Sequence, residues 1–382
     1  MRIAVVGAGA AGLLFSLLIK RRFPAWEVSA FEQNPVGATY GFGVVFSDGA
    51  LAFLERDEPE LSGIVEAAME RWPMQRIVHR GERVEVDGNG FSAIGRLALQ
   101  EILQRLSRRA GVHIRYGRAI SSLSELAGAD LVVGADGSNS LVRSELAAQF
   151  VPSVEVLTNR FAWYGTAQRF ECLTLTFRES EHGSFVAHHY RHAPAMSTFV
   201  VECDAATWKR AGLDRMGDTE SRACCEKVFA PDLGGHALES NKSVWRQFPL
   251  VRNERWVARP SSSGYAVLLG DALRTVHFSI GSGTRLAFED AIALERAFAE
   301  RGDDVPRALE LFERTRRPVV EKLLSAANAS SYWYEKFPEK MGLAPWRLAY
   351  DYMTRSGRMT EERLRGQAPK FMARVDKERG GS

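Results

Sequence analysis

The sequence is poor in the features that mark secreted, membrane and nucleic-acid-binding proteins. Its 382 residues carry a net charge of only +3, which gives no case for nucleic acid but does not hinder an anionic substrate. The apolar run over residues 13–19 is far too short to span a bilayer, and a chain that starts on a predicted core strand shows no signal peptide. The few cysteines lack the spacing of a metal site and suit a reducing cytoplasm; they are Cys172, Cys203, Cys224 and Cys225.

The sequence also lacks internal repeats and low-complexity linkers, so we expect interleaved domains rather than domains joined in series. The composition, 45% hydrophobic and 25% charged, is ordinary for a soluble protein, and the length allows two domains with cores of their own. We therefore expect a cytoplasmic protein that binds no membrane, no nucleic acid and no metal. The sequence does not indicate an oligomeric state.

Three glycines follow the first predicted strand, residues 2–6, in the pattern G-x-G-x-x-G. Gly7 allows a tight turn, Gly9 lets the backbone approach a pyrophosphate, and Gly12 lets the next helix pack closely on the strand. The N-terminus of that helix offers free N–H groups and a partial positive charge to phosphates. The pattern predicts a dinucleotide site, and a glycine-rich turn without a ligand is the alternative.

A second predicted strand, residues 27–31, ends at Glu32, about 20 residues after Gly12. A carboxylate at this place can accept hydrogen bonds from the adenosine ribose hydroxyls, and it disfavours a 2′-phosphate. FAD and NAD therefore remain open, whereas NADP is not expected here. Ala11 and Gln33 complete the candidate cofactor contacts of this unit.

Three charged residues extend the candidate cofactor site. Arg96 is the first residue of a predicted helix, where a positive charge is unfavourable because the helix dipole is positive at that end. A nearby pyrophosphate would compensate this repulsion, so Arg96 is a candidate pyrophosphate ligand. A solvated surface arginine is the alternative. Asp136 and Asp271 each follow an apolar predicted strand, and α/β proteins bind ligands at such strand ends. Asp271 is suited to hold a ribityl or ribose hydroxyl.

Two loops are candidates for contact with a flat cofactor ring. The loop before the helix of residues 285–298 contains glycines that let the backbone approach a ring edge, and the helix points its positive end there. Its candidate contacts are Gly281, Ser282, Gly283 and Thr284. Residues 35–50 are punctuated by glycine and form either a wall over the ring, with Val45 and Phe46, or a plain connection.

The pattern changes over residues 158–204, where four strand-like runs separated by polar turns predict an antiparallel sheet inserted into the first domain. Residues 74–91 alternate around glycines and predict a hairpin. His188 and His189 are adjacent and therefore point to opposite faces of their strand, whereas His188 and Tyr190 share one face. At most one of the two histidines can face a given cavity, and a structural role is the alternative for His188.

Three motifs stand in a fixed order along the chain: GAGAAG with Glu32, Asp136-Gly137, and Gly270-Asp271-Ala272. Together they resemble the single-component FAD-dependent aromatic hydroxylases with the para-hydroxybenzoate hydroxylase fold. The resemblance implies an α/β fold with a Rossmann-like FAD-binding domain, an interleaved antiparallel-sheet substrate domain and a C-terminal helical segment. The expected domains are residues 1–73, 92–157 and 262–330 for FAD, residues 74–91 and 158–261 for substrate, and the helical segment 331–382.

The resemblance also implies a reaction. FAD is the resident cofactor, and NAD(P)H docks transiently to reduce it, in keeping with the lack of a second G-x-G-x-x-G motif after a strand. Dioxygen then gives a flavin C4a-hydroperoxide, which hydroxylates an electron-rich aromatic ring in a dry cavity. The positive end of the helix after Gly283 would stabilise negative charge on the reduced flavin. A flavin halogenase is disfavoured because the Trp-x-Trp-x-Ile-Pro motif of that family is missing.

Longer strings narrow the resemblance. Residues 40–48, 163–170, 197–203 and 277–294 are similar to the aryl-CoA hydroxylases, such as salicyloyl-CoA 5-hydroxylase and the monooxygenase half of 2-aminobenzoyl-CoA monooxygenase. The violacein-pathway hydroxylases share much of this, but residues 350–365 again favour the aryl-CoA group. We expect an aryl-CoA thioester and O2 as substrates. The alternatives are a free or pathway-bound indole or phenol, an FAD-dependent reductase without oxygenation, and a flavin-binding protein without catalysis.

The resemblance suggests roles for residues outside the cofactor motifs. His277 is the expected hydrogen-bond partner or base for the donor group of the ring, with His188 and Tyr190 as further catalytic candidates; bracing its loop is the alternative for His277. Arg274 stands where the wider family usually has histidine, so the charge beside the flavin is expected to differ. The expected substrate contacts are Val45, Phe46, Tyr164, Phe278 and Arg358. Arg358 belongs to a C-terminal arginine cluster that could bind the phosphates of CoA, and a solvated basic helix face is the alternative. The cluster consists of Arg355, Arg358, Arg363 and Arg365.

Overall fold

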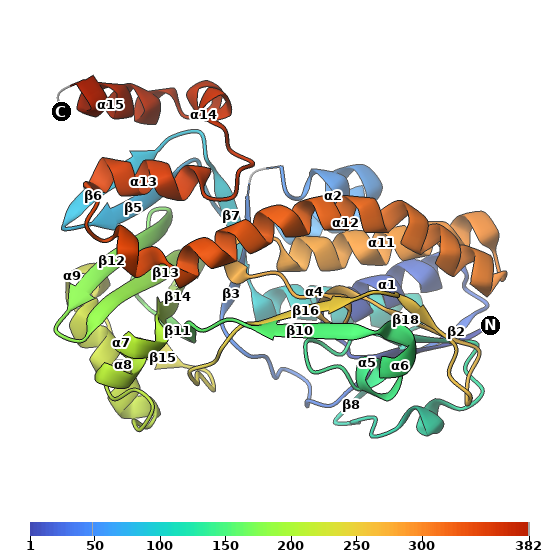
Figure 1. Ribbon diagram of the computed structural model, residues 1–382. Coiled ribbons are helices and arrows are strands. Elements are labelled where there is room, and N and C mark those ends of the chain that lie inside the picture. The colour runs from blue at the N-terminus through green and yellow to red at the C-terminus, as the bar shows by residue number, and fades with distance from the viewer. Residues whose placement is uncertain (48, 381–382) are drawn as a thin grey trace.

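The computed structural model describes residues 1–47 and 49–380, and two main sheets organise the chain (Figure 1). The first sheet has six strands in the order β17-β18-β9-β1-β2-β8, and every pairing is parallel except that of β17 with β18. After Arg2 its strand β1 is buried, as expected for a parallel strand between helical layers. The strands are β1 (Arg2–Val6), β2 (Glu27–Glu32), β8 (His113–Tyr116), β9 (Leu131–Gly134), β17 (Val257–Ala258) and β18 (Tyr265–Leu268).

Helices cover the first sheet, and α1 packs against both α4 and α11. The apolar run of the sequence is the buried stretch of α1, and α4 begins at Arg96 as predicted. Among the residues that the structure describes, no helix is long and apolar enough to cross a membrane. The helices of this half are α1 (Ala10–Arg22), α2 (Ala52–Asp57), α3 (Pro59–Glu66), α4 (Arg96–Ala110), η1 (Leu123–Leu126), α5 (Leu141–Glu145), α6 (Ala147–Phe150), α10 (Gly270–Leu273), η2 (Phe278–Ile280) and α11 (Gly283–Arg301).

The second sheet has seven strands in the order β15-β11-β14-β13-β12-β5-β6. The hairpin of β5 and β6 joins it through a parallel pairing of β5 with β12, whereas the other pairings are antiparallel. Residues far apart in the sequence thus share one sheet, which confirms the predicted interleaved α/β fold. The strands are β5 (Gln75–His79), β6 (Glu82–Val86), β11 (Arg160–Thr166), β12 (Leu173–Ser180), β13 (Gly183–Ala193), β14 (Met196–Cys203) and β15 (Leu238–Ser240).

Two small sheets connect the halves. A three-stranded sheet consists of β3 (Gly43–Ser47), β7 (Phe91–Gly95) and β4 (Glu70–Trp72), and it lies against β13. A two-stranded sheet pairs β10 (Pro152–Val156) with β16 (Pro249–Asn253). These two strands are about 100 residues apart in the sequence, and their pairing holds together the two segments that connect the main sheets (Figure 1).

The two faces of the second sheet have different neighbours because side chains alternate along each strand. One face packs on α7 (Ala205–Arg210), α8 (Asp218–Val228) and α9 (Ala230–Leu233) through residues that include Tyr164 and Phe199. The opposite face packs on the end of α12 and on α13 through Leu175 and Phe177. The second face is the one that meets the first domain.

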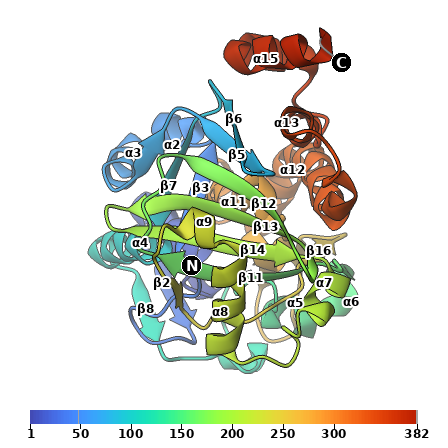
Figure 2. The same ribbon diagram turned by 90° about the vertical axis from the view of Figure 1, so that its left-hand side faces the viewer.

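The long helix α12 (Val305–Glu335) serves both halves. It packs on α11 near its start and against the second sheet near its end, through Trp333 and Tyr334. The expected domain boundary at residue 330 therefore falls inside a continuous helix, because the helix needs both partners to bury its apolar face. The remaining helices, which rise beyond β5 and β6 in Figure 2, are η3 (Phe337–Lys340), α13 (Pro345–Thr354), α14 (Glu361–Gln367) and α15 (Pro369–Gly380).

Candidate active site

The turn between β1 and α1 is shaped for a ligand that approaches the backbone. A side chain at Gly7, where φ is +98°, would place its Cβ 2.3 Å from the carbonyl oxygen of Ala135, and a Cβ at Gly12 would lie 2.0 Å from the carbonyl oxygen of Gly7. Gly7 and Gly12 are therefore required by the protein's own packing. A Cβ at Gly9 would meet no described atom within 4 Å, so the protein's own packing does not require glycine there and the space is open to a ligand.

The first turn of α1 leaves its N–H groups free for an anion. Gly9 is the N-cap residue, no side chain of the described residues caps the helix, and the first turn contains no acidic residue. Unpaired N–H groups and the helix dipole together favour a phosphate at this end. The side chain of Ala11 is directed to the turn of α10, where a Cβ at Gly270 would lie 3.1 Å from it.

Glu32 is held in place at the end of β2. One carboxylate oxygen accepts a hydrogen bond from the Ala8 N–H at 3.1 Å, and the other accepts from the backbone and the side-chain amide of Asn34 at 2.9 and 2.7 Å. The carboxylate therefore lies beside the glycine turn with a fixed orientation, as a ribose acceptor requires. Gln33 is exposed next to it.

Asp136 combines a helix cap with a free oxygen. Its Oδ2 accepts hydrogen bonds from the N–H groups of Leu141 and Val142 at 2.7 and 3.3 Å, while Ser140 caps the same helix by accepting from Arg143 at 3.0 Å. The other oxygen, Oδ1, is buried without a hydrogen-bond partner within the described part of the chain. Because a buried acceptor without a donor is costly, this oxygen is suited to a ligand hydroxyl.

Arg96 and Asp271 lie close enough to attract one another. Both side chains are accessible to solvent, yet each is surrounded by protein atoms. Burial lowers the pKa of Arg96 and raises the pKa of Asp271, and the attraction between them partly opposes both shifts. The Arg96 guanidinium also lies 5.7 Å from the centre of the Trp163 ring. Accessible groups in crowded surroundings are what a deep cofactor cleft predicts, so these residues and the glycine turn fit FAD.

The loop before α11 approaches β3 closely. Gly281 has φ +59°, and a Cβ there would lie 3.1 Å from the carbonyl oxygen of Val45. Helix α11 then starts at Gly283, after Ser282, without a side-chain cap from the described residues, so its positive end is open as predicted for a flavin-facing helix. Thr284 lies in the first turn of that helix.

The structure separates the two predicted residues of β3. Val45 packs near Trp72 and Tyr190, on the side of the second sheet, whereas Phe46 is fully buried in the core of the first domain. Phe46 is therefore not available to a substrate, and that expectation is corrected. The reason is the alternation of side chains along a strand, which sends neighbours to opposite faces.

Phe278 stands at the centre of an aromatic cluster that forms the candidate substrate pocket. Its ring lies 4.2 Å from His277, 5.0 Å from Phe161, 5.3 Å from His188 and 6.2 Å from Trp163, measured between ring centres. These residues come from η2, β11 and β13, so three distant segments meet here. Rings at such distances offer faces and edges on which an aromatic substrate can stack.

Tyr164 lies on the opposite side of the sheet from this cluster. It is fully buried, and its hydroxyl pairs with Ser221 of α8 at 3.2 Å. Its predicted role as a substrate contact is therefore wrong, and Phe161 and Trp163 are the residues of β11 that lie beside Phe278. Alternation along β11 would have allowed either set, since the sequence did not reveal which face meets the first domain.

His277 and His188 are both buried beside the aromatic cluster, and both are neutral at pH 7. Burial lowers the pKa of His277 to about 4 and that of His188 to about 3. His277 Nδ1 accepts a hydrogen bond from the Ser279 N–H at 3.4 Å, which orients its ring. Neutral imidazoles in a dry pocket can accept a proton or a hydrogen bond from a substrate.

Tyr190 does not present a free hydroxyl to this pocket. Its hydroxyl donates to the carbonyl oxygen of Gly43 at 3.0 Å, and burial raises its pKa. The contact ties β13 to β3, so the structure gives Tyr190 a bracing role between the two halves. His188 and Tyr190 do share one face of the strand, as their spacing predicts, because they alternate with His189.

Arg355 is the arginine of the C-terminal cluster that reaches the pocket. Its guanidinium donates to the carbonyl oxygen of Ser279 at 3.0 Å and to the Ser330 hydroxyl at 2.9 Å, and it lies 3.7 Å from the centre of the Tyr352 ring. Arg358 is exposed in the turn after α13. The sequence pattern could not separate them, because which arginine points inward depends on where α13 docks.

Arg274 points away from the flavin cleft. Its guanidinium forms two contacts with the carboxylate of Asp290, at 2.6 and 2.9 Å, and Arg316 contacts the same carboxylate at 2.9 Å. All three side chains are almost completely buried. Arg274 thus belongs to an ion-pair cluster that ties the α10 turn to α11 and α12, and it attracts Asp271 in the same turn; the expected difference of charge beside the flavin stays a prediction.

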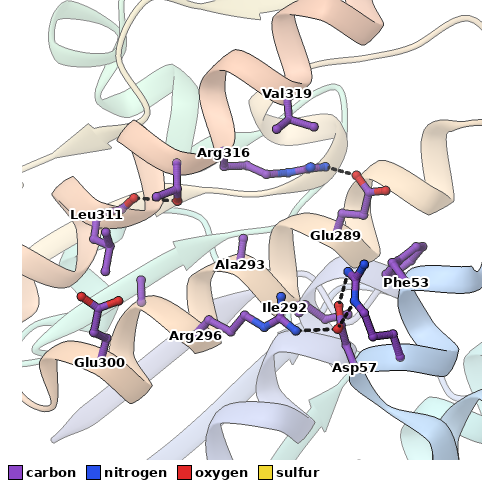
Figure 3. A pocket seen from close by; sticks show the side chains of 13 residues that line it. Phe53, Asp57, Glu289, Ile292, Ala293, Arg296, Glu300, Leu311, Arg316 and Val319 are labelled. Carbon is purple, nitrogen blue, oxygen red and sulfur yellow. Dashed lines mark hydrogen bonds and ion pairs between the residues drawn. The ribbon is translucent and has the colours of Figure 1, made fainter.

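A separate hollow between α2, α11 and α12 contains none of the predicted site residues (Figure 3). Its charged side chains are paired: Asp57 contacts both Arg56 and Arg296, and Glu289 contacts Arg316. Within residues 1–47 and 49–380, no group of three or more His, Cys, Asp or Glu side chains is arranged to hold a metal ion.

Comparison with known proteins agrees with this geometry. A family model described as "FAD binding domain" matches residues 113–327. The chain is 40% identical to a salicyloyl-CoA 5-hydroxylase of Streptomyces, over 93% of this chain and 70% of that protein. It is 32% identical to the 3-hydroxy-4-methyl-anthranilyl-[aryl-carrier protein] 5-monooxygenase of Streptosporangium sibiricum, over 94% and 95%, and 34% identical to the protodeoxyviolaceinate monooxygenase of Chromobacterium violaceum, over 90% and 91%.

The fold is shared with solved flavoenzymes. A variant of 2-methyl-3-hydroxypyridine-5-carboxylic acid oxygenase superimposes with a TM-score of 0.69 over 96% of both chains, at 18% identity. At that identity the likeness concerns the fold alone, whereas the sequence relatives concern the family. The chain therefore belongs to the FAD-dependent aromatic monooxygenases, the flavoprotein hydroxylases with the para-hydroxybenzoate hydroxylase fold.

Proposed function

We propose that the protein hydroxylates the aromatic ring of an aryl-CoA thioester, with salicyloyl-CoA converted to 2,5-dihydroxybenzoyl-CoA as the sharpest form. The observation that supports an aromatic substrate is the cluster around Phe278, where aromatic rings and two neutral histidines lie close together. When bound, FAD supplies the activated oxygen, with electrons from NAD(P)H. The protein's own residues orient the ring, exclude water and accept a proton.

Two relatives support the thioester part of the proposal. One is named for a CoA thioester and another for an aryl group on a carrier protein, and the chain matches more than two thirds of each. The protodeoxyviolaceinate monooxygenase supports a second candidate, a free or pathway-bound indole or phenol, at 34% identity. The two candidates share the same ring chemistry and differ in what is attached to the ring.

His277 is the proposed partner of the ring's donor group. Electrophilic hydroxylation needs electron density on the ring, and removal of the proton from a phenol or aniline supplies it. His277 is buried beside Phe278, and burial lowers its pKa to about 4, so it needs a negative charge nearby to hold that proton; the attraction of Glu202 raises the pKa of His277. The Arg355 contact with Ser279 supports the same short loop.

The test of the proposed function is NAD(P)H oxidation by the FAD-loaded protein with salicyloyl-CoA and, separately, with free salicylate. We expect stimulation and a product that is heavier by one oxygen atom with the thioester. Labelled dioxygen should deliver one atom to that product, which excludes a reductase. Product from neither compound, with FAD bound, would refute the aryl-CoA proposal and direct the search to indoles and phenols.

Replacing His277 with alanine should lower hydroxylation about 100-fold, the lower end of the usual contribution of a general base. FAD content should not change, because His277 belongs to the substrate pocket rather than to the cofactor cradle. Turnover with salicyloyl-CoA and flavin absorbance of the purified protein measure the two effects. His236→Ala, at an exposed histidine, is the control. Unchanged turnover of His277→Ala would leave His277 only a bracing role.

Reversing the charges of Arg358 and Arg363 should raise the KM for the CoA thioester about tenfold, as expected when two exposed contacts with phosphates are lost. Both side chains are exposed, Arg358 in the turn after α13 and Arg363 in α14, and Arg363 donates to the carbonyl oxygen of Arg358 at 3.0 Å. Arg314→Glu, at an exposed position of α12, is the matched control. The same KM in the double variant would remove this patch from the proposed CoA site.

A further inference from the structure

Glu202 is a buried carboxylate on the same sheet face as the aromatic cluster. It lies on β14 opposite Phe161 of β11 and Val186 of β13, and only 1% of it is exposed. One oxygen accepts a hydrogen bond from the Asn159 side chain at 2.8 Å. The other, Oε2, lies 3.6 Å from Nε2 of His188, and neither of these two atoms has a hydrogen-bond partner among the described residues.

This arrangement is expensive for a purely structural group. A buried carboxylate costs several kcal/mol unless it is paired and hydrogen-bonded, and here one oxygen is satisfied while the other faces a histidine at a distance too long for a hydrogen bond. Asn159, in turn, is anchored by a second bond to the carbonyl oxygen of Tyr334 at 2.9 Å. The carboxylate is thus fixed, but its free oxygen is not used by the protein.

The groups around Glu202 make it the local partner for positive charge. Besides His188, the titratable and charged side chains that act on the cluster are His277 from the η2 loop, Tyr334 and Glu335 from α12, and Tyr352 and Arg355 from α13 and its end. Burial raises the pKa of Glu202, and the attraction of His277 and the Asn159 hydrogen bond oppose that rise only in part. The Glu335 carboxylate is turned outward, where it accepts from the N–H groups of Thr158 and Asn159 at 2.7 and 2.9 Å.

We propose that Glu202 is a positioning residue for hydroxylation, whose free oxygen stabilises the positive charge that the histidine pair acquires from the substrate. This inference rests on the proposed function, in which the donor group of the ring gives up a proton. The O–H or N–H bond of that group breaks, its electron pair stays on the ring substituent, and the proton forms an N–H bond on an imidazole. The imidazolium then faces the free Glu202 oxygen in a medium of low dielectric constant, where a close opposite charge is most effective.

The test follows the ionisation of a phenol inside the pocket. Wild type, Glu202→Gln and Glu202→Asp are prepared with FAD bound, and the absorbance of bound salicyloyl-CoA is titrated against pH. We expect the acid dissociation constant of the bound phenol to be at least tenfold smaller in Glu202→Gln, because the imidazolium loses its counter-charge, and close to wild type in Glu202→Asp. The kcat of hydroxylation should fall with it, while KM and FAD content stay the same.

Two further variants keep the result interpretable. His188→Gln removes the partner of the free oxygen and should shift the phenol titration in the same direction, which covers the case that Glu202→Gln fails to fold. Glu310→Gln removes an exposed carboxylate near the other end of α12 and should leave the titration unchanged. Equal titration of the bound phenol in wild type, Glu202→Gln and His188→Gln would overturn the inference, even if the variants are less stable.

Failure of the proposed function can be distinguished from failure of the inference about Glu202. If wild type binds no salicyloyl-CoA, the aryl-CoA proposal fails, and the titration is repeated with 4-nitrophenol as a small phenol probe. A tenfold smaller dissociation constant in Glu202→Gln would then still support the role of Glu202. Equal titrations, or a 4-nitrophenol that remains fully protonated in every protein, would overturn it.

Discussion

Replacing Gly9 with aspartate should yield a protein that folds at least as well as wild type but no longer retains FAD. Gly9 has an extended conformation, φ −79° and ψ −170°, that any residue can adopt, and a Cβ there would meet no described atom within 4 Å. Aspartate is also among the best N-cap residues, and its charge is favourable at a helix N-terminus. The apoprotein should therefore gain up to about 1 kcal/mol of stability.

The same change should block the cofactor. The added carboxylate would lie where the pyrophosphate approaches the first turn of α1, and two like charges about 4 Å apart repel by about 4 kcal/mol near a protein surface. That repulsion corresponds to an approximately 1,000-fold weaker affinity for FAD. A change that strengthens the helix thus removes the ligand, and no loss of folding can explain such a result.

The measurement is FAD affinity by fluorescence quenching, together with thermal unfolding of the apoprotein. Gly217→Asp is a matched control, because Gly217 is the N-cap residue of α8, has φ −70°, and is also free of atoms within 4 Å of an added Cβ among the described residues. It should leave the FAD affinity unchanged. Normal FAD binding by Gly9→Asp would place the pyrophosphate elsewhere.

The cofactor half of the site could be predicted from the sequence because its signals are local. Gly7, Gly9 and Gly12 stand within one turn, and the structure shows that the protein's own packing requires Gly7 and Gly12, whereas the space at Gly9 is open. The helix that begins at Arg96 was also visible as a periodic pattern. Such features depend on neighbours in the sequence, so no tertiary knowledge was needed.

The substrate half could be predicted only in part, because it depends on which face of a strand meets which partner. Tyr164 and Trp163 are equally plausible in the sequence, and the pairing of β11 with β14 and the docking of α8 decide between them. Glu202 was hidden within an apolar run that reads as an ordinary core strand. Its role becomes visible only when β13 places His188 3.6 Å away.

The buried ion pairs of Asp290 also depend on tertiary contacts that the sequence does not reveal. Breaking them is expected to have the largest effect on stability. Asp290 lies on α11 and is 0% exposed, yet it contacts two arginines, Arg274 after α10 and Arg316 on α12, and the N–H of Gly270 at 3.3 Å. In the sequence, Arg274 suggests only that the charge beside the flavin differs from that of the wider family. The carboxylate that neutralises it could not be identified from sequence distance.

Replacing Asp290 with alanine should lower the free energy of unfolding by about 3–5 kcal/mol, the usual cost of leaving a buried partner charge uncompensated. The loss should be large because Arg274 is 3% exposed and Arg316 6% exposed, so neither guanidinium can turn to water without moving α10 or α12. Asp290→Asn should lose less, since an amide oxygen can still accept hydrogen bonds from both arginines. Urea unfolding of the three proteins measures the difference.

The control is an exposed pair on the same helix layer. Glu310 and Arg314 are 3.8 Å apart on α12 and more than 60% exposed, so Glu310→Gln should change the unfolding free energy by less than about 1 kcal/mol. A loss of that small size for Asp290→Ala would mean that water reaches the cluster. In a rigid cluster, by contrast, the two unpaired arginines would disturb the α10 turn, and because Asp271 lies within that turn, FAD affinity should fall in the same variant. Measuring both quantities on Asp290→Ala therefore separates a rigid turn from a hydrated one.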